Sequence, residues 1–123
     1  MTDILIVDDD KELSCLLQEY LKSVNYSSEV VNSGEEALTV LSKTMPLMVL
    51  LDIMLPIVDG YEVCRKIRAD EKTRLLPVVF MTALDVPRLI EKCYKAGGND
   101  VVMKPLDHTD LLGKIKKYIP ANN

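Results

Sequence analysis

The chain of 123 residues has no tryptophan, one phenylalanine, one histidine and three cysteines. Three thiols cannot all pair and none lies in a CxxC motif, which argues against redox sensing or metal binding by these cysteines. Cys15, Cys64 and Cys93 each fall on the apolar stripe of a predicted helix, so we expect buried, reduced thiols. The single histidine, His108, has no acidic or cysteine partner at ligand spacing, and we expect it at the surface.

The sequence also lacks a long apolar run and a surplus of positive charge. The longest apolar run, Met45 to Leu51, is far too short to span a bilayer. The start, Met1-Thr2-Asp3, lacks the basic residues of a secretory signal, so we expect a cytoplasmic protein with no membrane partner. The net charge of −4, with acids and bases interspersed, argues against direct nucleic acid binding. The length fits one domain, expected at residues 1–120, with a tail at 121–123.

Apolar patterning alternates between short continuous runs and longer stripes with helical spacing. The short runs predict strands at residues 4–7, 27–31, 47–52, 77–81 and 101–103. The stripes between them predict amphipathic helices, the first over residues 11–24 with Leu16 and Leu17 on its apolar face. Capping side chains precede the five helices: Asp10, Ser33, Asp59, Asp85 and Asp107. This order predicts an α/β fold, a doubly wound five-stranded parallel sheet with helices on both faces. For the strand order we adopt 2-1-3-4-5, the order of the known flavodoxin-like fold.

Each predicted strand ends in, or is followed directly by, a polar residue. In chain order they are Asp8 with Asp9, then Asn32, Asp52, Thr82 and Lys104. The first and third strands are neighbours in the predicted order, so Asp8, Asp9 and Asp52 should converge at the carboxyl edge of the sheet. Because burial and mutual repulsion both disfavour these charges, a divalent cation is expected, and an oxygen shell suits Mg2+. Asp10 is better placed to cap the first helix than to join this site.

The same edge suits the transfer of a phosphoryl group to a carboxylate. Aspartate is an established covalent phosphoryl acceptor. A metal ion, the Thr82 hydroxyl and the Lys104 ammonium would stabilise charge on the transferred group. Asp52 is a better acceptor than the acids of the first strand, because it lies between them and the Thr82–Lys104 pair.

With these residues in place, the chain closely resembles the receiver domain of two-component response regulators over essentially its full length. The matching segments are residues 4–9, 52–60 and 81–83 and the pair Lys104-Pro105. The resemblance implies that Asp52 is phosphorylated by a partner histidine kinase or phosphotransfer protein. It implies a phosphoacceptor that assists its own phosphorylation and dephosphorylation, not an enzyme in the usual sense. The signal would pass to a downstream effector domain or protein, and we include a phosphorylation-dependent homodimer among the expected partners.

The resemblance also implies roles for the individual site residues. The Mg2+ ligands would be Asp9, Asp52 and the backbone carbonyl of Met54, with Asp8 holding a metal-bound water. Thr82 and Lys104 would contact the phosphoryl group. The Lys104-Pro105 peptide bond is expected to be cis, a form that is rare outside X-Pro bonds.

One position departs from the family pattern, and two others bear on the lifetime of the phosphoryl group. Val101 stands where these proteins usually carry an aromatic residue whose rotamer follows the threonine. We therefore expect the switch to act through the Thr82 loop and the fourth helix, including Tyr94, within a surface that also contains the fifth strand and fifth helix. Met54 and Leu84 flank the path of the hydrolytic water and neither can orient it, which predicts a long-lived phosphoryl group.

Three rival functions fit the residues less well. A haloacid-dehalogenase-like phosphatase would use the D-x-D at Asp8 to Asp10, but its pattern continues with Thr or Val where this chain has Glu12, and no cap insertion is present. A flavin-binding electron carrier would need a hydroxyl- and glycine-rich phosphate loop after the first strand, where three acids would repel the phosphate. A degenerate receiver that only docks partners is disfavoured because all five site residues are present.

Overall fold

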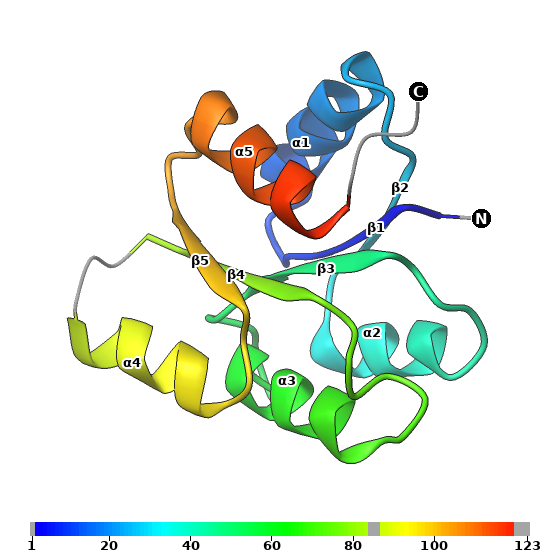
Figure 1. Ribbon diagram of the computed structural model, residues 1–123, viewed down its shortest axis with the longest axis vertical. Helices are drawn as coiled ribbons and strands as arrows, with labels where there is room; N and C mark the ends of the chain where they lie inside the picture. Colours follow the sequence, from blue (N-terminus) through cyan, green and yellow to red (C-terminus); the bar gives the residue numbers. More distant parts are fainter. Residues whose placement is uncertain (1, 84–86, 120–123) are drawn as a thin grey trace.

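The computed structural model describes residues 2–83 and 87–119 and shows a parallel sheet between two layers of helices (Figure 1). The strands are β1 (Ile4–Val7), β2 (Ser28–Val31), β3 (Met48–Asp52), β4 (Val78–Thr82) and β5 (Asp100–Met103). They form one five-stranded sheet in the order β2-β1-β3-β4-β5, and every neighbouring pair is parallel. The predicted fold and strand order are confirmed.

Five helices connect and cover the strands. They are α1 (Lys11–Ser23), α2 (Gly34–Leu41), α3 (Gly60–Ala69), α4 (Pro87–Lys95) and α5 (His108–Tyr118). Figure 1 shows α1 and α5 on one face of the sheet and α2, α3 and α4 on the other. Within the described residues, no helix is both long enough and apolar enough to cross a bilayer.

Two apolar cores form because successive residues of each strand point to opposite faces of the sheet. The core beneath α1 and α5 contains Ile4, Ile6, Met48, Leu50, Val79 and Met81 from the strands. The core beneath the other three helices contains Leu5, Val7, Val49, Leu51, Val78 and Phe80. All residues of β1, β3 and β4 are buried, as expected for central strands covered on both sides. Their carboxyl ends are thereby held in a fixed arrangement.

The predicted caps are confirmed for the four helices whose capping residues are described. The capping side chains are Asp10 for α1, Ser33 for α2, Asp59 for α3 and Asp107 for α5, and each accepts a backbone N–H of the first turn. The predicted cap Asp85 and the neighbouring Leu84 lie outside the described residues. The predicted tail at residues 121–123 lies outside them too.

Helix α1 buries most of its predicted apolar face, but Leu16 and Cys15 point outward. Leu17 and Leu21 are buried, but Leu16 is 59% exposed and the Cys15 thiol lies at the surface. Ser14 is buried instead, and its hydroxyl donates to the Asp10 carbonyl at 2.9 Å. This bond satisfies the hydroxyl, so a small polar side chain can face the sheet and turn its neighbour outward. The prediction of a buried thiol is wrong for Cys15 and confirmed for Cys64 and Cys93.

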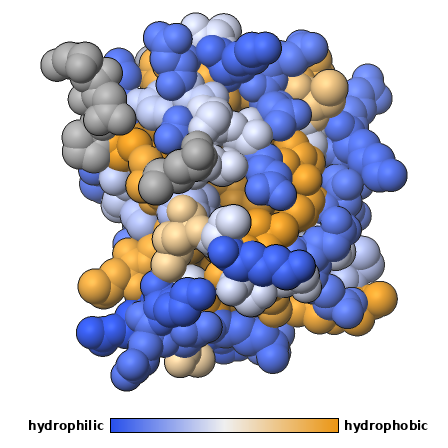
Figure 2. Space-filling view, turned by 90° about the vertical axis from the view of Figure 1, so that its right-hand side faces the viewer, coloured by the Kyte–Doolittle hydropathy of each residue, from blue (hydrophilic) through white to orange (hydrophobic). Residues whose placement is uncertain are grey.

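The surface mixes hydrophilic side chains with separate hydrophobic patches on the side that carries the N-terminus (Figure 2). The large apolar side chains that the structure exposes are Leu16, Met45, Leu47, Met54, Ile57, Leu75 and Tyr94. Ile57 also has a positive φ of 67°, which a β-branched residue rarely adopts. Ile57 belongs to the loop that connects β3 to α3, and this loop begins directly after Asp52, the last residue of β3.

Gly60 brings the N-terminus of α3 against the end of β3. A Cβ atom at Gly60 would lie 2.3 Å from the Asp52 carbonyl oxygen and 2.9 Å from the Ile53 Cα. The Gly60 N–H donates to the Ile53 carbonyl at 2.9 Å, so the approach is close and hydrogen-bonded. Only glycine fits here without moving the backbone that carries Asp52.

We expect Gly60→Ala to lower the free energy of unfolding by about 1–3 kcal/mol, because the added methyl group meets backbone atoms that cannot turn away. Urea unfolding monitored by circular dichroism measures the change. Gly113→Ala is the matched control. Gly113 lies inside α5 with nothing within 4 Å of an added Cβ. That substitution should raise stability by about 0.5–1 kcal/mol through helix propensity. Equal effects of the two substitutions would contradict the close approach at Gly60.

We also expect iodoacetamide at pH 8 to modify the folded protein at Cys15 and to spare Cys64 and Cys93. Burial raises the pKa of both of these thiols to about 11, so few thiolates form and the reagent cannot reach them. Peptide mass mapping identifies the modified residue. A Cys15→Ser variant should stay unmodified until it is unfolded in urea, when both remaining thiols should react. Fast reaction of Cys64 in the folded state would be inconsistent with this packing.

Candidate functional site

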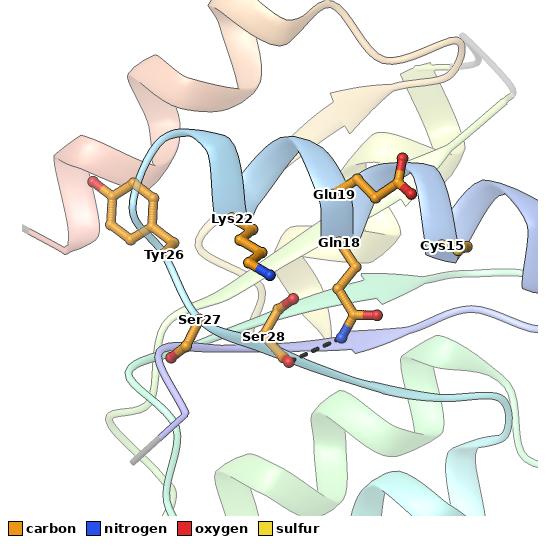
Figure 3. Close-up of a pocket in the computed structure, with 7 residues that line it drawn as sticks. All are labelled: Cys15, Gln18, Glu19, Lys22, Tyr26, Ser27 and Ser28. Carbon is orange, nitrogen blue, oxygen red and sulfur yellow. Dashed lines mark hydrogen bonds between the residues drawn. The ribbon is translucent and has the colours of Figure 1, made fainter.

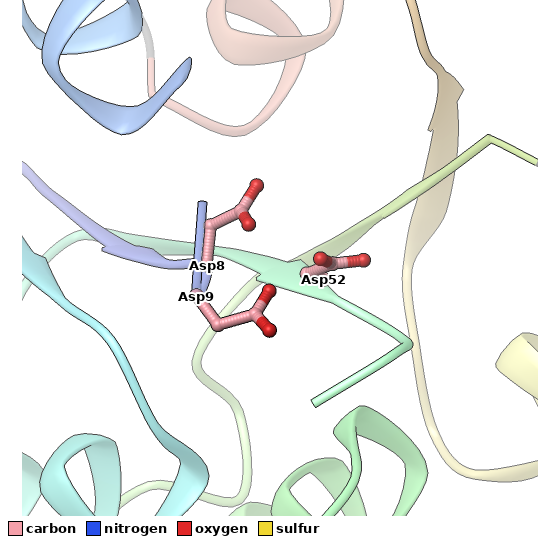
Figure 4. Close-up of side chains that lie close together, drawn as sticks. All are labelled: Asp8, Asp9 and Asp52. Carbon is pink, nitrogen blue, oxygen red and sulfur yellow. The ribbon is translucent and has the colours of Figure 1, made fainter. Parts of the chain in front are cut away.

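The three acidic residues predicted to converge do so at the carboxyl ends of β1 and β3. Register pairs Val7 with Leu51, so Asp8 and Asp9, just after β1, lie beside Asp52, the last residue of β3. Figure 4 shows the three side chains close together at this edge of the sheet. One ligand oxygen from each lies within 4.8 Å of the other two. The sequence prediction for these residues is confirmed in position.

The three carboxylates differ in burial and in their hydrogen bonds. Asp8 is 1% exposed and Asp52 is 6% exposed, whereas Asp9 lies at the surface. Asp8 Oδ1 accepts the Asp10 backbone N–H at 2.9 Å, and Asp52 Oδ1 accepts the Met54 backbone N–H at 3.3 Å. In the described part of the chain, nothing donates to the Asp9 carboxylate. The site therefore has two fixed inner carboxylates and one outer carboxylate placed only by its backbone.

Lys104 reaches across the end of β4 into the acidic group. Its Nζ lies 2.8 Å from Asp8 Oδ2 and 3.3 Å from Asp52 Oδ2. The Lys104 backbone N–H donates to the Thr82 carbonyl at 2.7 Å, which ties the end of β5 to the end of β4. The Lys104-Pro105 peptide bond is cis, as expected. Lys104 therefore lies at the edge of the sheet where the sequence predicts it, in contact with two of the three acids.

One ammonium leaves the site with excess negative charge. Burial raises the pKa of Asp52, Lys104 lowers it and Asp8 raises it again, and the net shift is upward. Burial would lower the pKa of Lys104, but its contacts with Asp8 and Asp52 outweigh burial and raise it. The site therefore favours the charged form of Lys104 and disfavours the charged form of Asp52. A bound divalent cation would remove this imbalance.

The donor set fits a hard divalent cation. Three carboxylates within 4.8 Å of one another offer only oxygen ligands, with no thiol or imidazole among them. Mg2+ prefers such oxygen donors and keeps several waters, which the exposed side of Asp9 can admit. A metal ion would compete with Lys104 for the oxygens of Asp8 and Asp52. The acidic group can therefore hold a metal.

Thr82 and Met54 lie next to the acidic group. Register pairs Asp52 with Met81, so Thr82, the buried last residue of β4, follows directly at the same edge. Met54 is 68% exposed on the loop after β3. It belongs to a cleft of about 450 Å3 lined by Asp9, Ile53, Met54, Leu55, Pro56, Asp59 and Tyr61. The cleft opens beside Asp9, so a second molecule can approach the site along largely apolar walls.

Two hydrogen bonds around the site could not be predicted from the sequence. Asn32 directly follows β2, and its side-chain amide donates to the Asp8 carbonyl at 2.9 Å. Tyr61, at the start of α3, donates its hydroxyl to the Leu89 carbonyl of α4 at 3.3 Å. The residue spacing could place Asn32 at the sheet edge, but not its hydrogen bond. These contacts depend on how loops turn, which apolar periodicity does not encode.

Comparison with known sequences identifies one family. The model of the response regulator receiver domain matches residues 4–116. The DNA-binding response regulator MtrA of Mycolicibacterium smegmatis is 34% identical over 119 residues, which cover 97% of this chain and 51% of that protein. The probable transcriptional regulator ycf27 of Guillardia theta is 36% identical over 98% of this chain and 46% of its own length. The chain thus spans about half the length of the curated relatives it matches.

Solved structures have the same fold. A putative response regulator from Chloroflexus aurantiacus superposes with a TM-score of 0.92 and 32% identity over 98% of both chains. The receiver domain of the sensor histidine kinase PA1611 from Pseudomonas aeruginosa superposes with a TM-score of 0.89 and 30% identity over 98% of both chains. That structure has a magnesium ion coordinated in its active-site cleft. These comparisons set aside the phosphatase and flavin-carrier alternatives. The chain therefore belongs to the response regulator receiver domain family, the phosphoacceptors of two-component and phosphorelay signalling.

Proposed function

We propose that Asp52 accepts a phosphoryl group from the phosphohistidine of a histidine kinase or phosphotransfer protein. The observation that supports this most directly is the position of Lys104, whose ammonium bridges the carboxylates of Asp8 and Asp52. In transfer, an oxygen of Asp52 forms a bond to phosphorus while the bond from phosphorus to the imidazole nitrogen breaks. The product is an aspartyl phosphate on this chain and a dephosphorylated histidine on the donor.

Asp52 is the residue of the acidic group best placed for this attack. It lies between Asp8 and Asp9 on one side and Thr82 on the other, and its second oxygen already contacts Lys104. Burial raises its pKa, which makes the carboxylate a stronger nucleophile than an exposed one, while Lys104 opposes its protonation. The Lys104 ammonium and the Thr82 hydroxyl would then hold the transferred group.

The proposed metal ligands are the carboxylates of Asp9 and Asp52 and the backbone carbonyl of Met54, with Asp8 acting through a bound water. When bound there, Mg2+ would neutralise charge on the phosphoryl oxygens during transfer. The mutual distance of the three carboxylates supports this assignment. So does the magnesium ion in the receiver domain that is 30% identical to this chain.

We further propose that residues 1–120 form the receiver domain in a cytoplasmic protein, and the family match over residues 4–116 supports this extent. A downstream effector domain or protein would receive the signal. The receiver itself would not bind nucleic acid, since its net charge is −4. The proposed output surface comprises the Thr82 loop, α4, β5 and α5, where Tyr94 is exposed and Val101 is buried. A homodimer formed on phosphorylation would use this surface.

We expect incubation with Mg2+ and acetyl phosphate to add one phosphoryl group, seen by intact mass, and Asp52→Asn to abolish the addition. EDTA should also abolish it, because the excess negative charge of the site would repel the incoming phosphoryl oxygens. Asp10→Asn is the matched control. Asn caps a helix as well as Asp, and Asp10 lies outside the carboxylate group. Size exclusion of the labelled protein tests the homodimer. Labelling that persists in Asp52→Asn would overturn the assignment.

We expect Met54→Asn to shorten the lifetime of the phosphoryl group by about tenfold. The exposed Met54 side chain lines the cleft beside the site and cannot orient water, whereas an amide can. One hydrogen bond to the attacking water in the transition state, about 1.4 kcal/mol, corresponds to that factor. The decay of the intact mass after removal of acetyl phosphate gives the lifetime. Met54→Leu should leave it unchanged, and an unchanged lifetime in Met54→Asn would refute the argument.

A further inference from the structure

The Asn32 side chain extends the hydrogen bonding between β1 and β2 by one bond beyond the last backbone pair. The Asp8 N–H donates to the Val31 carbonyl at 3.1 Å, and β2 ends at Val31. The chain then turns into Ser33, the extended N-cap residue of α2. At this point Asn32 Nδ2 donates to the Asp8 carbonyl at 2.9 Å. The side-chain amide thus takes the place of a backbone N–H that a longer β2 would supply.

This bond fixes the peptide group that carries Asp9. The Asp8 carbonyl and the Asp9 N–H belong to one planar peptide unit, so anchoring the carbonyl also fixes the start of Asp9. The carboxylates of Asp8 and Asp52 are held directly by Lys104. The exposed Asp9 carboxylate accepts no hydrogen bond or ion pair from residues 2–83 and 87–119. Its direction toward the other two carboxylates therefore depends on its backbone.

We propose that Asn32 is a positioning residue for the metal site, acting through the Asp8–Asp9 peptide group. This inference rests on the proposed function, in which Asp9 is a metal ligand. The three carboxylates repel one another at their mutual distance of 4.8 Å or less, and Asp9 alone is free to turn into solvent. Without the Asn32 anchor the metal-binding arrangement would have to be assembled as Mg2+ binds. Loss of an outer partner of a metal ligand typically weakens metal binding by roughly 10–100-fold.

A matched control exists at the other end of the same strand. Gln18 of α1 donates its side-chain amide to the Ser28 carbonyl at 3.0 Å, shown by the dashed line in Figure 3. In both bonds a side-chain amide donates to a backbone carbonyl at one end of the β1–β2 pair. Ser28 begins β2 and pairs with Ile4, at the end of the sheet remote from the acidic group. Gln18→Ala therefore removes the same kind of bond without touching the proposed metal site.

The experiment measures the Mg2+ dissociation constant by calorimetry for the parent, Asn32→Ala and Gln18→Ala, together with thermal unfolding in EDTA. We expect Asn32→Ala to raise the constant about tenfold and Gln18→Ala to leave it at the parent value. Asn32→Leu, which keeps the approximate shape but lacks the donor, should behave like Asn32→Ala. In the metal-free protein, 15N relaxation should show increased motion of the Asp9 amide in both Asn32 variants and not in Gln18→Ala.

Labelling with acetyl phosphate separates positioning from chemistry. In Asn32→Ala the Mg2+ concentration for half-maximal labelling should rise by the same factor, while the rate at saturating Mg2+ stays at the parent value. Suppose that the unmodified protein binds Mg2+ and is labelled at Asp52, and that both Asn32 variants bind Mg2+ with the same affinity. That result would overturn this inference alone. A parent that binds no Mg2+ and accepts no phosphoryl group would overturn the proposed function and this inference with it.

Discussion

Electrostatic repulsion among three carboxylates is the constraint around which the rest of the structure is arranged. Asp8, Asp9 and Asp52 place oxygens within 4.8 Å of one another. Two like charges about 4 Å apart at an effective dielectric constant of 20 repel by roughly 4 kcal/mol. Lys104 contributes one positive charge to this group, so part of the repulsion persists. The acidic group stays together because the strands that carry it are buried on both faces and cannot separate.

The backbone contacts around the site follow from this constraint. Side chains that repel one another cannot position themselves, so main-chain atoms and their partners must do it. Gly60 allows α3 to close against the Asp52 carbonyl, and the Lys104 N–H joins β5 to β4 at Thr82. Asn32 holds the Asp8 carbonyl in the same way. Each contact fixes the direction of a charged or reactive side chain by fixing the peptide group from which it projects.

The sequence was sufficient to predict the fold and the positions of Asp8, Asp9, Asp52 and Lys104. Apolar runs mark parallel strands, and a polar residue directly after such a run must lie at the carboxyl edge of the sheet. The rotation of a helix about its axis is not determined in this way. It depends on which side chains fit the sheet, and so the outward position of Cys15 could not be predicted.

The same reasoning applies to the contacts of long side chains. Lys114 of α5 donates to the Val101 carbonyl at 2.6 Å, and its Nζ lies 3.6 Å from Asp100 Oδ1. This contact holds β5 against α5 at Val101. By contrast, Cys93 is the one buried residue that α4 contributes over Pro87–Lys95. Helix α5, by comparison, buries Leu111 and Ile115. The smaller number of buried residues in α4 is consistent with the proposed output through the Thr82 loop and α4.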